Sequence, residues 1–234
     1  AFLTVVPKIG AAVALARLLQ VFPAEAANWH TLIAALSVAT MTLGNLAALW
    51  QRDVRRLLGW SSVSQSGYAL MAVAVVGLTE MALPALLFFL AGYAAANLAA
   101  FAVVSHLRGR TDIEHYAGLA TARPWTSIVL VLSLFSLVGI PPLVGFVGKL
   151  TLFVATIDAG YTWLAVVAIV NTVISLFYYL RVLATMYFDP LAAPVAVLGR
   201  WTGVGSAIAG FLVVALGLDA EAILALLRGV SVLP

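Results

Sequence analysis

Two lysines in otherwise apolar stretches are the residues of this sequence that could carry out chemistry. Lys8 lies in LTVVPKIGAAVALA, and Lys149 lies in PPLVGFVGKLTLFVAT. An ammonium group at the centre of a membrane helix costs about 2.5–3.5 kcal/mol, and such groups usually mark ion paths. A desolvated lysine can gain and lose a proton near neutral pH, whereas an arginine stays protonated. The two lysines therefore predict a proton relay.

Each lysine also has a structural interpretation, which the sequence leaves open. Lys8 lies only about 12 Å of helical rise from Ala1, so its amine could reach the membrane surface as a snorkelling side chain. Lys149 lies deeper within its apolar run, which favours a functional role over a structural one.

A stripe of polar residues is expected to support the lysines. In WSSVSQSGYAL, four polar side chains recur at helical spacing: Ser61, Ser64, Gln65 and Tyr68. The stripe could hold water between helices, or it could form interhelical hydrogen bonds that only stabilise the bundle. Two smaller pairs have the same spacing, Tyr93 with Asn97 and Asn171 with Ser175.

The composition argues against other kinds of site. The chain has no cysteine, which excludes disulfides, thiolate metal sites and iron–sulfur ligation on it. No acidic residue lies in the middle of an apolar stretch, so carboxylate coordination of a cation is not expected. No P-loop, dinucleotide fingerprint or nucleophile elbow is present. We therefore expect no catalytic residue, cofactor or metal on this chain, and no nucleic-acid partner.

The elements that would position these residues are membrane helices. The sequence is 64% hydrophobic and 9% charged, against about a quarter charged in soluble domains. This composition predicts an all-α polytopic membrane protein, with residues 1–234 forming a single transmembrane domain. A spanning helix needs about 20 apolar residues. Charged and turn residues divide the chain into seven such units, 1–22, 31–50, 57–77, 82–107, 125–157, 161–180 and 201–218.

The fifth unit, 125–157, is too long for one straight helix. Its 33 residues would reach about 50 Å, well beyond a hydrocarbon core of about 30 Å. Adjacent prolines flanked by glycines favour a break, and non-helical backbone at membrane depth must be buried or line a cavity. We therefore predict two half-helices in one crossing, broken within 139–148 and facing the protein interior. The residues of this predicted break are Gly139, Pro141, Pro142, Gly145 and Gly148.

The placement of arginines predicts the orientation. If every unit crosses once, eight arginines fall on the same side: Arg52, Arg55, Arg56, Arg108, Arg110, Arg123, Arg181 and Arg200. The positive-inside rule makes that side cytoplasmic. The C-terminus would then face outward.

Five stretches together resemble a known family: LTVVPKIGA, DVRRLLGWSSVSQSGYALMA, DIEHYAGLATARPW, SLVGIPPLVGFVGKL and ISLFYYLRVLATMYF. They are similar to the antiporter-like proton-translocating subunits of respiratory complex I and of multi-subunit sodium/proton antiporters. The last stretch looks most like subunit N of bacterial NADH:quinone oxidoreductase. The resemblance implies one inverted-repeat unit plus flanking helices, corresponding to helices eight to fourteen in the C-terminal part of a fourteen-helix subunit.

The resemblance also implies roles and partners. The chain would lie in a bacterial inner membrane. Lys8 would be the central lysine of helix eight, and Lys149 would be the lysine of the broken helix twelve, near the outer half-channel. Many relatives carry histidine where this chain has Gln65, which cannot itself titrate. The chain would be part of an enzyme only as a membrane subunit, because NADH, FMN, iron–sulfur clusters and quinone would bind partner subunits. Its neighbours would be other membrane-arm subunits and lipids.

Two other functions fit the same residues. Within the superfamily, the chain could belong to a sodium/proton antiporter complex or to a membrane-bound hydrogenase, and its partner chains would discriminate these. From another class, it could be a passive scaffold of the membrane arm. The scaffold interpretation predicts dry surroundings for both lysines and a loss of assembly, rather than of pumping, when they are replaced.

Overall fold

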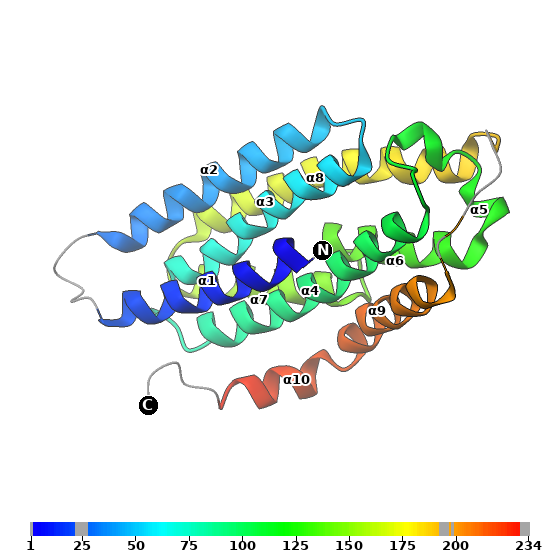
Figure 1. Cartoon of the computed structure of the whole chain (residues 1–234). Helices are drawn as coiled ribbons and strands as arrows, with labels where there is room; N and C mark the ends of the chain where they lie inside the picture. Colours follow the sequence, from blue (N-terminus) through cyan, green and yellow to red (C-terminus); the bar gives the residue numbers. More distant parts are fainter. Residues whose placement is uncertain (1, 22–27, 192–196, 198, 230–234) are drawn as a thin grey trace.

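The structure is a computed structural model that describes residues 2–21, 28–191, 197 and 199–229, so both ends of the predicted unit 1–22 lie outside it. The described residues form helices only, and Figure 1 shows the long ones lying side by side. The helices are α1 (Phe2–Val21), α2 (Trp29–Leu49), α3 (Val54–Ala74), α4 (Ala82–His106), the 3-10 helix η1 (Ile113–Tyr116), α5 (Leu119–Ala122), α6 (Pro124–Val138), α7 (Val144–Asp158), α8 (Thr162–Phe188), α9 (Arg200–Leu218) and α10 (Ala220–Leu227).

Five of the described helices are long and apolar enough to cross a membrane, namely α1, α2, α4, α8 and α9. Helix α3 has 21 residues but carries two arginines and the polar stripe. Helices α6 and α7 have 15 residues each, about 22 Å of rise. The expectation of an all-α polytopic membrane protein is confirmed, while the number of seven crossings stays a prediction.

The chain between α6 and α7 leaves the helical conformation over 139–143. Gly139 follows α6 with φ of +99°, a left-handed conformation that favours glycine. The predicted break was too long, because Gly145 and Gly148 lie inside α7. Both glycines serve close packing instead: a Cβ on Gly145 would lie 1.7 Å from the Ser136 carbonyl oxygen, and one on Gly148 would lie 3.2 Å from the Phe89 Cα.

Helix α4 lies at the centre of the bundle and packs against α3, α6, α7 and α9. Helices α2 and α3 approach each other closely, since a Cβ on Gly44 would lie 2.4 Å from the Ser64 backbone nitrogen. Small residues permit such approaches between membrane helices. This contact turns the polar stripe of α3 toward the interior.

The loops that carry most of the arginines pack together at one end of the bundle. The Ile113 N–H donates to the Arg52 carbonyl at 2.9 Å, which joins the loop after α4 to the corner between α2 and α3. Arg181 of α8 donates to the Leu49 carbonyl at 3.1 Å. Helix α8 itself continues to Phe188 rather than ending near 180 as predicted. Its arginine is held by backbone carbonyls and does not mark a helix end.

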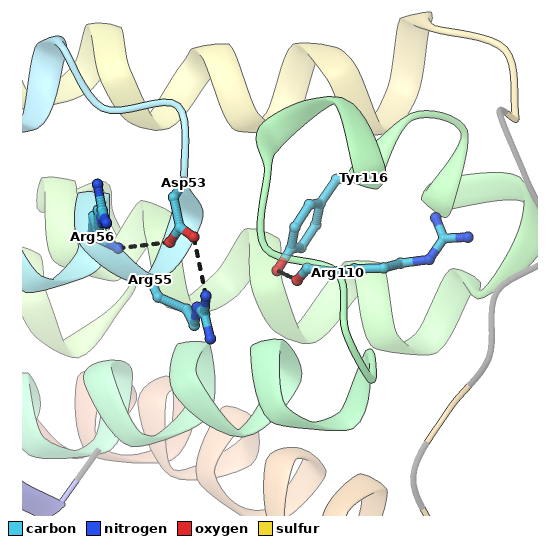
Figure 2. Close-up of polar contacts among 5 residues, drawn as sticks. All are labelled: Asp53, Arg55, Arg56, Arg110 and Tyr116. Atoms are coloured by element: carbon cyan, nitrogen blue, oxygen red, sulfur yellow. Dashed lines mark hydrogen bonds and ion pairs between the residues drawn. The ribbon is translucent and has the colours of Figure 1, made fainter.

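Asp53 caps the start of α3 at this end, as Figure 2 shows. Its carboxylate accepts the Arg56 N–H at 3.0 Å and pairs with the Arg55 guanidinium at 3.2 Å. Burial opposes ionisation of this carboxyl, but the hydrogen bonds from Arg56 and Arg55 outweigh it and lower the pKa of Asp53. The same figure shows the Tyr116 hydroxyl donating to the Arg110 carbonyl at 3.3 Å, which closes the neighbouring loop.

Candidate functional site

Lys149 lies inside the bundle on α7, with 3% of its surface exposed. Its Nζ donates to the Val138 carbonyl at 2.9 Å and makes a longer contact of 3.5 Å with the Thr172 hydroxyl. It also lies 4.3 Å from the centroid of the Tyr68 ring, within the range of a cation–π contact. The amine is thus contacted from α3, α6 and α8. We call Lys149 and its three partners, Tyr68, Val138 and Thr172, the Lys149 seat.

The two prolines explain why a backbone carbonyl is free to accept from this amine. In a continuous helix, the carbonyls of Leu137 and Val138 would accept from the N–H groups four residues later. Those positions are Pro141 and Pro142, which have no N–H. The Val138 carbonyl accepts from Lys149 instead, and the Leu137 carbonyl accepts from the Gln65 amide at 3.0 Å. The break therefore supplies two acceptors that side chains from other helices fill.

The close packing of the half-helices lets Lys149 reach back to the break. The Gly145 N–H donates to the Ser136 hydroxyl at 3.1 Å, across the break. Because Lys149 follows Gly145 by four residues, both lie on the same face of α7. The glycine thus sets the distance over which the lysine side chain must extend.

Lys8 lies on α1 and is half-buried. Its Nζ donates to both oxygens of Ser62 on α3, with 2.5 Å to the hydroxyl. The Ser62 hydroxyl contacts the Tyr93 hydroxyl at 2.6 Å, and Tyr93 donates to the Thr4 carbonyl at 2.7 Å. The amine therefore points toward α3 and α4, and these hydroxyls give it polar partners without a counter-ion.

Ser62 was missed by the sequence reasoning, because the predicted stripe followed the neighbouring face of α3. The i, i+4 spacing of Tyr93 and Asn97 was the available signal for this region. The Asn97 amide donates to the Thr4 hydroxyl at 2.7 Å, so this pair does lie beside α1.

The predicted stripe takes part in interhelical hydrogen bonds at three of its four positions. Ser61 bonds to the Tyr179 hydroxyl, Gln65 to the Leu137 carbonyl, and Tyr68 to the Thr172 hydroxyl at 2.9 Å. Ser64 is buried and its hydroxyl has no hydrogen-bond partner among the described residues. It packs against Gly44, where α2 and α3 are closest.

Gln65 and Tyr93 lie between Lys8 and Lys149 and line cavities next to both. Both line a cavity of about 160 Å³ beside Lys8, and both line a second cavity of about 10 Å³ beside Lys149. A cavity of about 10–15 Å³ can hold one water molecule. The two lysines thus border separate cavities that share two polar walls, and a continuous hydrated route between them stays a prediction.

A second polar cluster joins α2 to α8 near the Lys149 seat. The Asn45 amide donates to the Asn171 side-chain oxygen at 3.0 Å, and the Tyr178 hydroxyl donates to Asn45 at 3.0 Å. Asn171 was singled out from the sequence, whereas Asn45 and Tyr178 were not. All three are buried, so their mutual bonds satisfy polar groups that would otherwise be costly.

The described residues contain no group of three or more His, Asp or Glu side chains that could hold a metal ion. His30 bonds through Nδ1 to the Ala74 carbonyl at 2.7 Å, and His106 bonds through Nδ1 to the Thr202 hydroxyl at 2.8 Å. Both lie at or near helix ends, where a role in local packing accounts for them.

The chain as a whole is similar to known proteins. Residues 1–175 match the family described as NADH:quinone oxidoreductase/Mrp antiporter, TM. The chain is 58% identical over 180 residues to NADH-quinone oxidoreductase subunit N of Mycobacterium sp. (strain JLS), covering 77% of this chain and 38% of the relative. It is 47% identical over 228 residues to NADH-quinone oxidoreductase subunit N 1 of Streptomyces griseus, covering 96% and 48%.

The fold is also similar to a solved structure, respiratory complex I from Thermus thermophilus with bound aureothin. The TM-score is 0.74 at 32% identity, covering 83% of this chain and 45% of that chain. The present chain spans about half the length of the curated relatives it matches. The family and the five apolar helices make it a multi-pass bacterial membrane protein. The resemblance to antiporter-like complex I subunits is thus confirmed, and the chain belongs to the NADH:quinone oxidoreductase/Mrp antiporter transmembrane family.

Proposed function

We propose that the chain translocates protons across the membrane as part of a subunit of an NADH:quinone oxidoreductase, complex I. The observation that carries this proposal is the Lys149 seat, an almost fully buried amine on a backbone carbonyl at a helix break. Neither Lys149 nor Lys8 forms an ion pair within the described residues. A buried amine without a counter-ion is held in its charged form by neutral dipoles alone, so its charge can come and go with a proton.

In the proposed relay, Lys8 receives a proton and passes it through water to Lys149. Gln65 and Tyr93 line the cavities beside both lysines, and their polar groups would orient that water. Gln65 does not titrate, so water must carry the proton past it. Two ammonium groups repel each other, which couples their protonation and favours transfer over double occupancy.

The protonated Lys149 is stabilised by the Val138 carbonyl and the face of the Tyr68 ring. Release then requires that water reach the amine from the side of α7 that ends at Asp158. We propose that this side faces outward and that the arginine-rich end is cytoplasmic, in a single domain of seven crossings. Redox chemistry would take place on partner subunits that bind NADH, FMN, iron–sulfur clusters and quinone.

The test compares Lys149→Ala with Lys149→Arg in the assembled complex. Arginine keeps the positive charge but does not release a proton, so it separates titration from charge alone. We expect both variants to pump fewer protons per electron pair, in proteoliposomes that report proton uptake during NADH oxidation. Unchanged pumping in both variants would refute the relay.

The same experiment distinguishes the relay from a passive scaffold. The amount of assembled complex and its NADH oxidation rate in detergent are measured for each variant. A relay predicts normal assembly with reduced pumping. A scaffold predicts that assembly is lost and that whatever complex remains pumps with normal stoichiometry.

A further inference from the structure

Helices α6 and α9 pack closely at one level and leave a groove at another. A Cβ on Gly210 of α9 would lie 3.1 Å from Val129 of α6, so the helices are in contact there. Two turns earlier, Gly203 faces the His106 ring of α4 instead. On the side of this contact where both helices begin lies an open groove of about 440 Å³. It is lined by residues within 125–129 of α6 and 200–207 of α9, and we call it the α6/α9 groove.

The walls of this groove are apolar and its floor is made of small residues. Ile128 and Val204 line it and are 42% and 46% exposed, which places the groove on the outer surface of the described bundle. Ser206 and Ala207 supply little side-chain volume on the α9 side. The outer face of α9 continues apolar beyond the groove, with Ile208 also exposed. In a membrane protein, such a face contacts acyl chains.

The mouth of the groove is positively charged and aromatic. Arg200, the first residue of α9, lines it together with Trp125, the second residue of α6. The Arg200 guanidinium has no hydrogen bond or ion pair with any described residue, and no acidic side chain is among those lining the groove. Trp125 and Trp201 are each 81% exposed. Tryptophan is enriched at the membrane–water interface, so the mouth lies at headgroup depth.

We infer that the α6/α9 groove binds one acyl chain of an anionic phospholipid, whose headgroup pairs with Arg200. The positive mouth complements an anionic headgroup, because basic side chains between membrane helices attract such lipids. A flexible chain can enter a wedge that closes at Val129 and Gly210. A partner helix, about 10 Å across, needs an open path along its length and cannot enter this wedge.

The test uses photoactivatable lipids on the purified complex that contains this chain. The complex is reconstituted into phosphatidylcholine nanodiscs with a minor fraction of phosphatidylglycerol or phosphatidylcholine bearing a photoreactive acyl chain. Peptide mapping after illumination reports the labelled residues. We expect phosphatidylglycerol to label 125–129 and 203–207 in preference to phosphatidylcholine. This readout does not depend on proton pumping.

Two variants and two matched controls test the site. Arg200→Gln should reduce the preference for phosphatidylglycerol about fivefold, while Arg228→Gln, at the other end of the C-terminal helices, should not. Ala207→Leu fills the groove and should abolish labelling by both lipids. Gly205→Leu adds similar bulk to the same helix outside the groove, where a Cβ meets no atom within 4 Å, and should leave labelling unchanged.

Two results would overturn the inference. The first is equal labelling by both lipids that neither Arg200→Gln nor Ala207→Leu alters. The second is loss of a neighbouring subunit from Ala207→Leu complexes with lipid labelling unchanged, which would assign the groove to a protein partner.

Discussion

Replacing Gly145 by alanine is expected to remove Lys149 from its acceptor without changing the lysine. The added Cβ would lie 1.7 Å from the Ser136 carbonyl oxygen, whereas real Cβ contacts essentially never fall below 3.0 Å. The half-helices α6 and α7 must therefore separate by about 1.3 Å at this point. Lys149 lies one turn further along the same face, and close packing around this buried side chain keeps its rotamer. Its Nζ would therefore move with α7, and its distance to the Val138 carbonyl would grow from 2.9 Å to about 4.2 Å, beyond hydrogen-bond range.

The expected effect on function follows from the strength of the lost bond. A hydrogen bond to a charged group contributes about 1.5–3 kcal/mol, which corresponds to a 10- to 150-fold change in population of the seated ammonium. We therefore expect proton pumping per electron pair in Gly145→Ala complexes to fall to a small fraction of the wild-type value. The assay is proton uptake by proteoliposomes during NADH oxidation, at matched turnover.

Two further glycines provide graded controls for this experiment. A Cβ on Gly148 would lie 3.2 Å from the Phe89 Cα, a much smaller overlap, so Gly148→Ala should have an intermediate effect. A Cβ on Gly59 meets no atom within 4 Å, so Gly59→Ala should pump normally and slightly stabilise its helix. Wild-type pumping by assembled Gly145→Ala complex would refute the proposed dependence on the Lys149 seat.

Three further perturbations test separate parts of the structure. Pro142→Ala restores a backbone N–H that can compete with Lys149 for the Val138 carbonyl, so pumping should fall although assembly persists. Equal pumping by this variant and wild type would contradict that competition. Tyr68→Phe keeps the aromatic face and should pump nearly normally. Tyr68→Leu removes the cation–π contact with Lys149, about 0.5–2 kcal/mol, and should pump less. The measurement is the number of protons pumped per electron pair by each of the two variants. Asp53→Ala should lower the unfolding free energy by about 1 kcal/mol at pH 7, measured by thermal unfolding of the complex. Because the pKa of Asp53 is lowered, this contribution is present above the ordinary carboxyl pKa of about 3.9 and is lost as pH falls through the lowered value.

The features that the sequence predicted well depend on covalent chemistry or on long apolar runs. Runs of about 20 apolar residues predicted the five long apolar helices α1, α2, α4, α8 and α9. Two adjacent prolines predicted an interruption, which lies at 139–143, because neither has an N–H to donate. Burial of Lys149 followed from its position deep within such a run. These inferences need no knowledge of how the helices are rotated against one another.

The features that the sequence could not predict depend on that rotation. Ser62 and Ser61 are neighbours on α3, yet only Ser62 faces Lys8, because the close approach of α2 to α3 fixes which side of the helix points to α1. The pairing of Gln65 with the Leu137 carbonyl requires α3 and the end of α6 to be side by side. The unit predicted over 161–180 ends before Arg181, whereas α8 continues to Phe188. The Arg181 guanidinium donates to the backbone carbonyls of Leu49, at the end of α2, and of Gln51, just after it.

The acceptors for Gln65 and Lys149 are main-chain oxygens, and this limits how mutation can alter them. No side-chain substitution at Leu137 or Val138 deletes the oxygen that receives the proton-bearing group. These two oxygens are free to accept because Pro141 and Pro142, four residues later, have no backbone N–H. In natural variants, substitutions at Pro141 and Pro142 should therefore disturb these two contacts more than substitutions at Leu137 and Val138.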